Sequence, residues 1–377
     1  MILLIPGPVT THPEVKAALL QDIAPWDNDW GHRLAVVRQR LLALAGGVSG
    51  RHAALLLQGC GHFAAEAAVR TFVPRGGKVL VPITGNYAER FARLAHEAGR
   101  TVVRLSVGPK ERASPAAVAR ALAADPTIGH VAMVYSETSS GIVHDIAAIG
   151  REAAALGRRT LVDAVSAFGA LPLDIAAMPE ADAVFFTSNK CLEGMPGLSA
   201  IVVDTARTAA CAAQAESWSL DLADILRHGQ TSGWGSFRFT PPAQVVEALA
   251  AALDRLDSES RPARLARYEA NMRTLYHGVQ RHGLTPCLPE AIQGPIVLNV
   301  HAPEHANWTL QGFVDALKPE GFVISNFHNT PWPSFRLGCI GAIGKSEMEQ
   351  AVTAIGRALD RMGIVQRQAG TAQRQAA

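Results

Sequence analysis

The sequence predicts an α/β protein with a mostly parallel sheet in a large domain, followed by a smaller α/β C-terminal domain. From AALLLQ at residues 53–58 to LSAIVVD at 198–204, apolar runs alternate with helical segments, as in strands joined by helical crossovers. The runs before Asp163 and Lys190 are almost wholly apolar, which is typical of strands covered on both faces. Two long amphipathic helices between Gln244 and His282 then lead into the smaller domain.

Composition shifts along the chain predict its division into segments. Three prolines near the start favour an extended arm, since each fixes its own φ and restrains the residue before it. The last residues show no apolar period and are expected to be disordered. We therefore expect an N-terminal arm near the active site, a large domain, a small C-terminal domain and a disordered tail, at residues 1–14, 15–255, 256–365 and 366–377.

Bulk properties exclude several function classes. The 377 residues are 48 % hydrophobic and 18 % charged with a net charge of +2, so the chain should be globular, with no nucleic-acid or membrane partner. The apolar start MILLIPGPV is too short for a signal peptide, and no run approaches the roughly 20 apolar residues of a membrane span. We expect a cytoplasmic protein. Its five cysteines include no CxxC pair, so neither a disulfide framework nor a metal site is indicated.

A carboxylate and an amine stand at the ends of two neighbouring apolar strands. Asp163 follows TLV, and Lys190 follows AVFF within AVFFTSNK. Ligands of parallel sheets bind outside the carboxyl ends of the strands, so the two side chains should meet at one site. A lysine that forms a Schiff base and an acid that keeps a pyridine nitrogen protonated are what pyridoxal 5′-phosphate (PLP) chemistry requires. An ordinary surface ion pair is the competing interpretation.

Four sequence blocks carry a resemblance to a known family. They are LLIPGPVTTHPEV, VDAVSAFGALPLDI, TSNKCLEGMPG and FRLGCIGAIG, they span nearly the whole chain, and they occur in the family's order. The sequence resembles the 2-aminoethylphosphonate–pyruvate aminotransferase family of class V, fold-type I PLP-dependent enzymes. The resemblance implies that Lys190 carries PLP and that Asp163 holds its ring nitrogen. It also implies a transaminase that converts 2-aminoethylphosphonate and pyruvate into phosphonoacetaldehyde and alanine, as a homodimer with composite active sites.

The glycine turn in QGCGHF predicts an anion site. Gly61 and His62 open a helix, and the free N–H groups of a helix start bind phosphate. The resembling family has GSGT here and binds the PLP phosphate with it, which implies this role for Gly61 and His62, with Cys60 adjacent. A dinucleotide turn is the alternative, but the third glycine of GxGxxG is absent.

The resemblance also assigns residues around the ring. Tyr87 would stack on the cofactor, Thr138 would bond its phenolic oxygen, and Val165 would pack beneath the ring. The assignments of Tyr87 and Thr138 each have a plain structural alternative. Tyr87 could be a hydrophobic staple at a helix start, and Thr138 could belong to a turn that caps the helix beginning near Asp145.

Two more distant residues complete the predicted site. Thr240 in RFTPPAQVV matches a threonine that reaches the neighbouring subunit's cofactor phosphate; alternatively it caps the helix that starts near Pro241. Arg336 lies in the apolar strand SFRLGCI, and a buried arginine needs an anion. By resemblance it binds the acid group of the substrate, and an internal salt bridge is the alternative.

Three other functions fit parts of the sequence. SNFHNTPWP, just before Arg336, departs from the family's YPGK-like segment, so a related aminophosphonate transaminase or an alanine/serine–glyoxylate-type class V aminotransferase is the closest alternative. A class V lyase such as a cysteine desulfurase would need a cysteine on a flexible loop ahead of Arg336, whereas Cys339 follows it in a strand. A nucleotide-binding dehydrogenase would use the Gly59–Gly61 turn.

Overall fold

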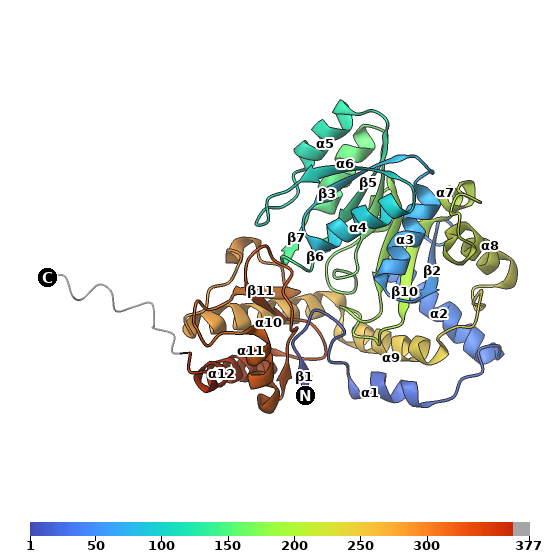
Figure 1. The fold of residues 1–377 in the computed structure, drawn as a ribbon. Coiled ribbons are helices and arrows are strands. Elements are labelled where there is room, and N and C mark those ends of the chain that lie inside the picture. The colour runs from blue at the N-terminus through green and yellow to red at the C-terminus, as the bar shows by residue number, and fades with distance from the viewer. Residues whose placement is uncertain (365–377) are drawn as a thin grey trace.

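The computed structural model describes residues 1–364, so the predicted tail at 366–377 and the predicted boundary at 365 lie outside the described residues. A seven-stranded sheet forms the centre, in the order β2-β10-β9-β8-β5-β3-β4 (Figure 1). Only β10 runs antiparallel to its neighbours. The strands are β2 (His52–Gln58), β3 (Lys78–Ile83), β4 (Thr101–Ser106), β5 (Ile128–Val134), β8 (Arg159–Asp163), β9 (Ala181–Thr187) and β10 (Leu198–Asp204). The predicted mostly parallel α/β sheet is confirmed.

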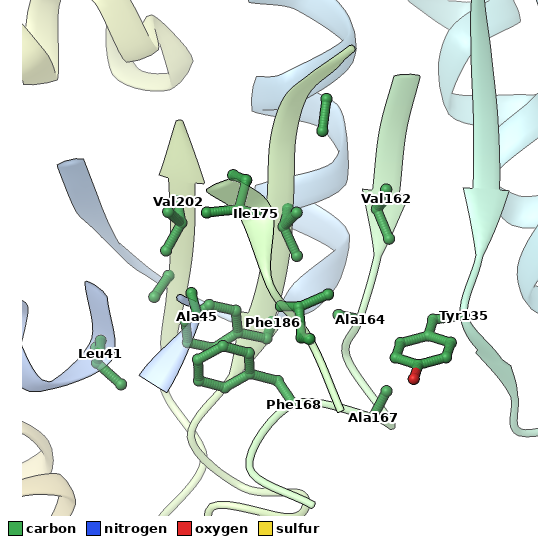
Figure 2. Packing of buried hydrophobic residues seen from close by; sticks show 14 of the residues in the cluster. Leu41, Ala45, Tyr135, Val162, Ala164, Ala167, Phe168, Ile175, Phe186 and Val202 are labelled. Carbon is green, nitrogen blue, oxygen red and sulfur yellow. The ribbon is translucent and has the colours of Figure 1, made fainter. Parts of the chain in front are cut away.

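Helices cover both faces of this sheet, which explains why its strands are so apolar. One buried cluster joins the sheet to α2 (Asn28–Leu44), α5 (Pro115–Ala124), α6 (Ile146–Ala155) and α9 (Ala243–Glu259). In this cluster Phe168 stacks on Phe186 with ring centroids 3.4 Å apart (Figure 2). A second cluster joins the other face to α3 (Gly61–Phe72), α4 (Asn86–Glu97) and α8 (Leu222–Ser232). The helix α7 (Thr205–Ala210) follows β10.

The C-terminal part has a core of its own, reached through α9 and α10 (Arg261–Arg281), the two predicted amphipathic helices. There α10, α11 (Leu310–Leu317) and α12 (Lys345–Arg361) pack beside the antiparallel pair β11 (Val297–His301) and β13 (Ser334–Gly338). The N-terminal strand β1 (Ile2–Leu3) pairs with β12 (Phe322–Val323), and α1 (Pro13–Ala17) follows it. The short pair β6 (Ser136–Glu137) and β7 (Ile142–Val143) lies beyond β5.

Helix starts differ from the sequence prediction at two places. The spacing of Ser346 and Glu349 in the sequence predicts a capping box at the start of the last helix. That prediction is wrong, because α12 begins earlier and Glu347 accepts from the Gly344 N–H at 2.9 Å. Thr240 does not cap α9, which begins at Ala243 after Pro242 without a side-chain cap. By contrast, α6 begins near Asp145 as expected, but Asp145 itself caps the helix by accepting from the Ala148 N–H, and the turn that contains Thr138 does not.

A buried carboxylate with three basic partners lies at the amino end of β9, opposite the end at which the predicted site lies. Asp182, at the start of β9, is fully buried and accepts from Arg159 at 2.6 Å, from Arg207 at 3.2 Å and from His130 at 3.2 Å.

Asp182→Asn should lower the free energy of unfolding by about 2–4 kcal/mol, since it leaves two arginines without their counter-charge. Urea unfolding measures this. The exposed Asp257, which pairs with Arg40, is the matched control, and Asp257→Asn should cost less than about 1 kcal/mol. Equal losses would contradict the prediction.

Candidate active site

A cavity of about 230 Å³ lies at the carboxyl edge of the sheet. Seven predicted site residues line it: Cys60, Gly61, His62, Tyr87, Asp163, Val165 and Lys190. They come together because β2, β3, β8 and β9 run in the same direction and end at this edge. A larger hollow of about 450 Å³ between α1, α2 and α9 contains none of them.

The start of α3 forms one wall of the cavity. Gly59, with φ of +128°, turns the chain out of β2, and Cys60 precedes the helix without a side-chain cap bond. The first N–H groups of α3 therefore have no intrahelical partner and can serve an anion. Gly61 must be small, since a Cβ there would come within 2.5 Å of Val165 Cγ2. Val165 thus packs directly against the helix start.

Asp163 ends β8 and faces the cavity. Its Oδ1 accepts from the Val165 N–H at 2.8 Å. Burial, with a smaller contribution from Glu137, raises the pKa of the Asp163 carboxyl to about 7, against the opposing effects of the Val165 hydrogen bond and of Lys190. A cation in the cavity would offset the cost of this buried charge.

Lys190 lies three residues beyond the end of β9 and is only 9 % exposed. Its Nζ donates to the Pro6 carbonyl oxygen at 2.7 Å, so the N-terminal segment lies against the predicted catalytic lysine. Gly7 permits this approach, because a Cβ there would stand 2.8 Å from Nζ. Within residues 1–364 no salt bridge joins Lys190 to Asp163, and the lysine is buried. The interpretation as an ordinary surface ion pair is therefore wrong.

Three predicted residues do not line this cavity. Thr138 is buried nearby, where its hydroxyl shares a 2.6 Å hydrogen bond with Ser166 Oγ. Thr240 is exposed in the segment before α9. Arg336 lies on β13 beside Asn299 of β11, and it is near enough to Lys190 to lower the pKa of that amine.

Arg336 is buried among neutral groups. Its Nε donates to Ser325 Oγ at 3.1 Å, and the amide oxygen of Asn329, oriented to satisfy its neighbours, accepts from Nη1 at 3.1 Å. The guanidinium carbon lies 4.4 Å from the centre of the Phe327 ring. Burial lowers the pKa of Arg336, and no carboxylate pairs with it in the described part of the chain. An internal salt bridge is thus not its role here, and its charge needs an anion from outside.

Sequence reasoning missed several residues of the site. Arg90, Thr187 and Asn189 line the cavity, while Ser325, Phe327 and Asn329 surround Arg336. Thr187 and Asn189 lie close to Lys190 in the sequence, at the end of the same apolar strand, and this position could have predicted that they line the cavity. Arg90 follows Tyr87 by three residues on a helix and could have been placed on the same face.

The family described as Aminotransferase class-V matches residues 38–302. The chain belongs to the class V aminotransferase family. The 2-aminoethylphosphonate–pyruvate transaminases of Pseudomonas putida and Pseudomonas aeruginosa are each 40 % identical to it, and each alignment covers 97 % of this chain and 98 % of the relative. The pyridoxamine–pyruvate aminotransferase structure from Mesorhizobium loti is 26 % identical, with a TM-score of 0.87 over 96 % of this chain and 93 % of that one.

The cavity of this class V aminotransferase fits PLP, the cofactor on which the family depends. Thr187 Oγ1 is buried, lines the cavity and has no hydrogen-bond partner in the described residues. The free N–H groups at Gly61 and His62 suit a phosphate, and Asp163 suits a protonated ring nitrogen. Tyr87 lines the same cavity, but the Arg90 guanidinium already lies over its ring at 5.0 Å. Stacking of Tyr87 on the cofactor stays a prediction.

The environment of Lys190 predicts a pH dependence for its reactivity. Burial, followed by Arg336, lowers the pKa of the Lys190 amine to about 8. An amine is nucleophilic only when neutral, so its reaction rate should rise as pH increases through about 8 and level off above it. The pH profile of PLP capture by cofactor-free enzyme measures this rise. A rate that continues to climb to pH 10, as an ordinary lysine requires, would contradict the assignment.

Proposed function

We propose that this class V aminotransferase moves the amino group of 2-aminoethylphosphonate to pyruvate, giving phosphonoacetaldehyde and alanine. The main support for this proposal is the buried Arg336 guanidinium. It lacks a carboxylate partner within residues 1–364, and it lies close enough to Lys190 to lower the pKa of the Lys190 amine. Both proposed substrates carry an acid group at one end and the reacting carbon at the other. Relatives 40 % identical over nearly the full length, and named for this reaction, support the choice of substrates.

The chain's own residues can divide the work of the reaction. When bound, PLP supplies an aldehyde that carries the amino group and a ring that accepts electrons from the amine-bearing carbon. Lys190 Nζ, with its pKa near 8, can take a proton from that carbon and return one to the acceptor carbon. Asp163 holds the ring nitrogen in its protonated form. Arg336 binds the phosphonate of the donor and then the carboxylate of the acceptor, so one site serves both substrates in turn.

Buried cysteines give no support to the lyase alternative. Cys339 is fully buried on the C-terminal side of Arg336, and burial raises the pKa of its thiol to about 12. A nucleophilic cysteine needs an accessible thiolate. Cys191, next to Lys190, is also fully buried, and burial likewise raises the pKa of its thiol to about 12.

An amino-donor screen tests the proposed function. Purified, PLP-loaded enzyme is offered 2-aminoethylphosphonate, L-serine or L-cysteine with pyruvate or glyoxylate as acceptor, and L-alanine with glyoxylate alone, and the amino acid formed is measured. We expect alanine from 2-aminoethylphosphonate and pyruvate, at a kcat/KM at least about tenfold above every other pair, which corresponds to about 1.4 kcal/mol. A preference for serine or alanine with glyoxylate would replace this proposal by the alanine/serine–glyoxylate type. Sulfide release from cysteine would indicate the lyase.

We also propose that two chains form a dimer with composite active sites. Thr240 is exposed, does not cap α9 and lies outside the cavity of its own chain, so it is free to approach a partner's cofactor phosphate. Large aromatic side chains are exposed around it: Trp218 at 71 % and Phe239 at 43 %, in edge contact with each other at 5.2 Å. Exposed apolar groups of this size are typical of interfaces.

Mixing two inactive variants should test the shared site. Lys190→Ala removes the amine, and Thr240→Glu places a carboxylate against the partner's phosphate; each should lower activity strongly when present in both chains. Reassembled from equal amounts, half of the dimers are mixed and each holds one intact site, so about a quarter of wild-type activity should return. Light scattering should give about twice the 40.0 kDa chain mass. A fully active monomer, or no recovery on mixing, would contradict the proposal.

A further inference from the structure

Arg90 is a charged residue at the cavity to which the reaction described above gives no role. It stands on the first turns of α4, three residues after Tyr87, and its guanidinium carbon lies 5.0 Å from the centre of the Tyr87 ring. It lines the same cavity as Asp163 and Lys190. The two acidic residues of its helix bind elsewhere: Glu89 pairs with Arg104, and Glu97 pairs with Arg93. Within residues 1–364, Arg90 has no carboxylate partner.

Arg90 and Arg336 act on one region of the site. Burial is the main reason for the lowered pKa of Lys190, and both arginines add to it by their charge. Arg90 also contributes to the lowered pKa of Arg336, behind the burial of that guanidinium and against the opposing effect of Tyr87. Tyr87 is therefore near both arginines. The acid-binding end of the site thus holds two arginines that form no salt bridge with any carboxylate of residues 1–364.

Arg336 alone is poorly matched to a doubly charged group. A guanidinium has five N–H donors. Ser325 takes the one on Nε, Asn329 takes one on Nη1 and Tyr87 takes a further one, so two are left for a ligand. A carboxylate, with one charge and two oxygens, is matched by such a fork. A phosphonate carries two charges near and above neutral pH and has three oxygens, so it needs a second cation.

We propose that Arg90 is this second cation, a specificity-determining residue that favours a phosphonate over a carboxylate at the donor's acid end. The proposal rests on the proposed function for the choice of substrate class. Arg90 is solvent-exposed on one side and stacks on Tyr87, so its side chain can turn toward a bound anion without loss of core packing. The acceptor keto acid, with a single charge, should depend on Arg336 and hardly on Arg90.

A matched pair of unreactive anions isolates this role. Ethylphosphonate and propanoate have the acid groups of the two substrate classes on the same two-carbon chain, and neither has an amine to react. Their dissociation constants for the PLP-loaded enzyme are measured by calorimetry for wild type, Arg90→Gln and Arg93→Gln. Arg93 is the control, since it lies on the same helix, is exposed and forms a salt bridge with Glu97 at 3.7 Å.

Arg90→Gln should weaken ethylphosphonate binding about tenfold, as expected for the loss of one charge-assisted contact that is partly open to water, and propanoate binding less than about threefold. Arg93→Gln should change neither. In wild type the preference for ethylphosphonate should grow as pH rises through its second ionisation, and Arg90→Gln should flatten that rise. Equal weakening of both anions, no weakening of ethylphosphonate, or wild-type enzyme that does not prefer ethylphosphonate would overturn the inference.

The donor screen keeps the two proposals apart. If 2-aminoethylphosphonate is not a donor but ethylphosphonate binding depends on Arg90, the proposed function fails and the phosphonate anchor stands. If 2-aminoethylphosphonate is the preferred donor and Arg90→Gln leaves ethylphosphonate binding unchanged, the function stands and the second anchor is refuted.

Discussion

Lys190→Ala should lower the rate of amino transfer by a factor of about 10⁴ or more, the largest effect expected of any single change in this enzyme. The substitution removes the only amine that lines the cavity among residues 1–364, and with it the group positioned to move the proton at the reacting carbon. General acid–base catalysis alone contributes about 10²–10⁴, and loss of the covalent attachment adds to this. Steady-state kinetics with both substrates measures the loss.

Controls separate this role from damage to the fold. Lys16→Ala, at an exposed lysine of α1, should leave the rate unchanged. The Lys190→Ala protein should still bind PLP, since the contacts at Gly61, Thr187 and Asp163 remain, and fluorescence titration checks this. Borohydride treatment of the wild-type enzyme followed by peptide mapping should find the cofactor on Lys190. A label on another lysine, or a variant with a rate within tenfold of wild type, would refute the assignment.

The sequence was sufficient for the sheet and for the strand-end residues of the site. Continuous apolar runs, glycine turns and the order of strands and helices are local signals, and parallel strands bring their carboxyl ends to one edge whatever lies between them. The sequence therefore predicts that Asp163, Lys190 and the start of α3 lie together. The start of α12 was misplaced because Ser346 and Glu349 satisfy the same spacing as Gly344 and Glu347.

What the sequence could not supply are contacts between distant segments. The Pro6 carbonyl accepts from Lys190 across 184 positions of the chain, and no local pattern marks that oxygen. Ser325 and Asn329 lie in a segment without regular period, and only the fold shows that they hold Arg336. The choice between capping and a trans role for Thr240 likewise needed the observed start of α9.

Arg336→Lys should raise KM for donor and acceptor together, by about 10- to 100-fold. Lysine keeps the positive charge but loses the planar fork that serves Ser325, Asn329 and a ligand at once. The lysine side chain is shorter and ends in a single ammonium group. The buried Ser325 hydroxyl and the Asn329 amide then compete with the substrate for its N–H donors. Loss of a hydrogen bond to a charged group costs about 1.5–3 kcal/mol, which corresponds to this range. Because Arg336 binds the acid end and not the reacting carbon, kcat should change less than KM.

Three further measurements make the Arg336 prediction decisive. The cofactor absorbance of Arg336→Lys should match wild type, since Arg336 does not line the cavity that fits PLP; a changed spectrum would place it at the cofactor instead. Arg357→Lys, at an exposed arginine paired with Glu320, is the control and should leave both KM values unchanged. A loss confined to the keto acid would mean that the phosphonate has its own anchor. In that case Arg90 would be the main phosphonate anchor, and the double variant Arg90→Gln/Arg336→Lys should then bind ethylphosphonate no better than propanoate.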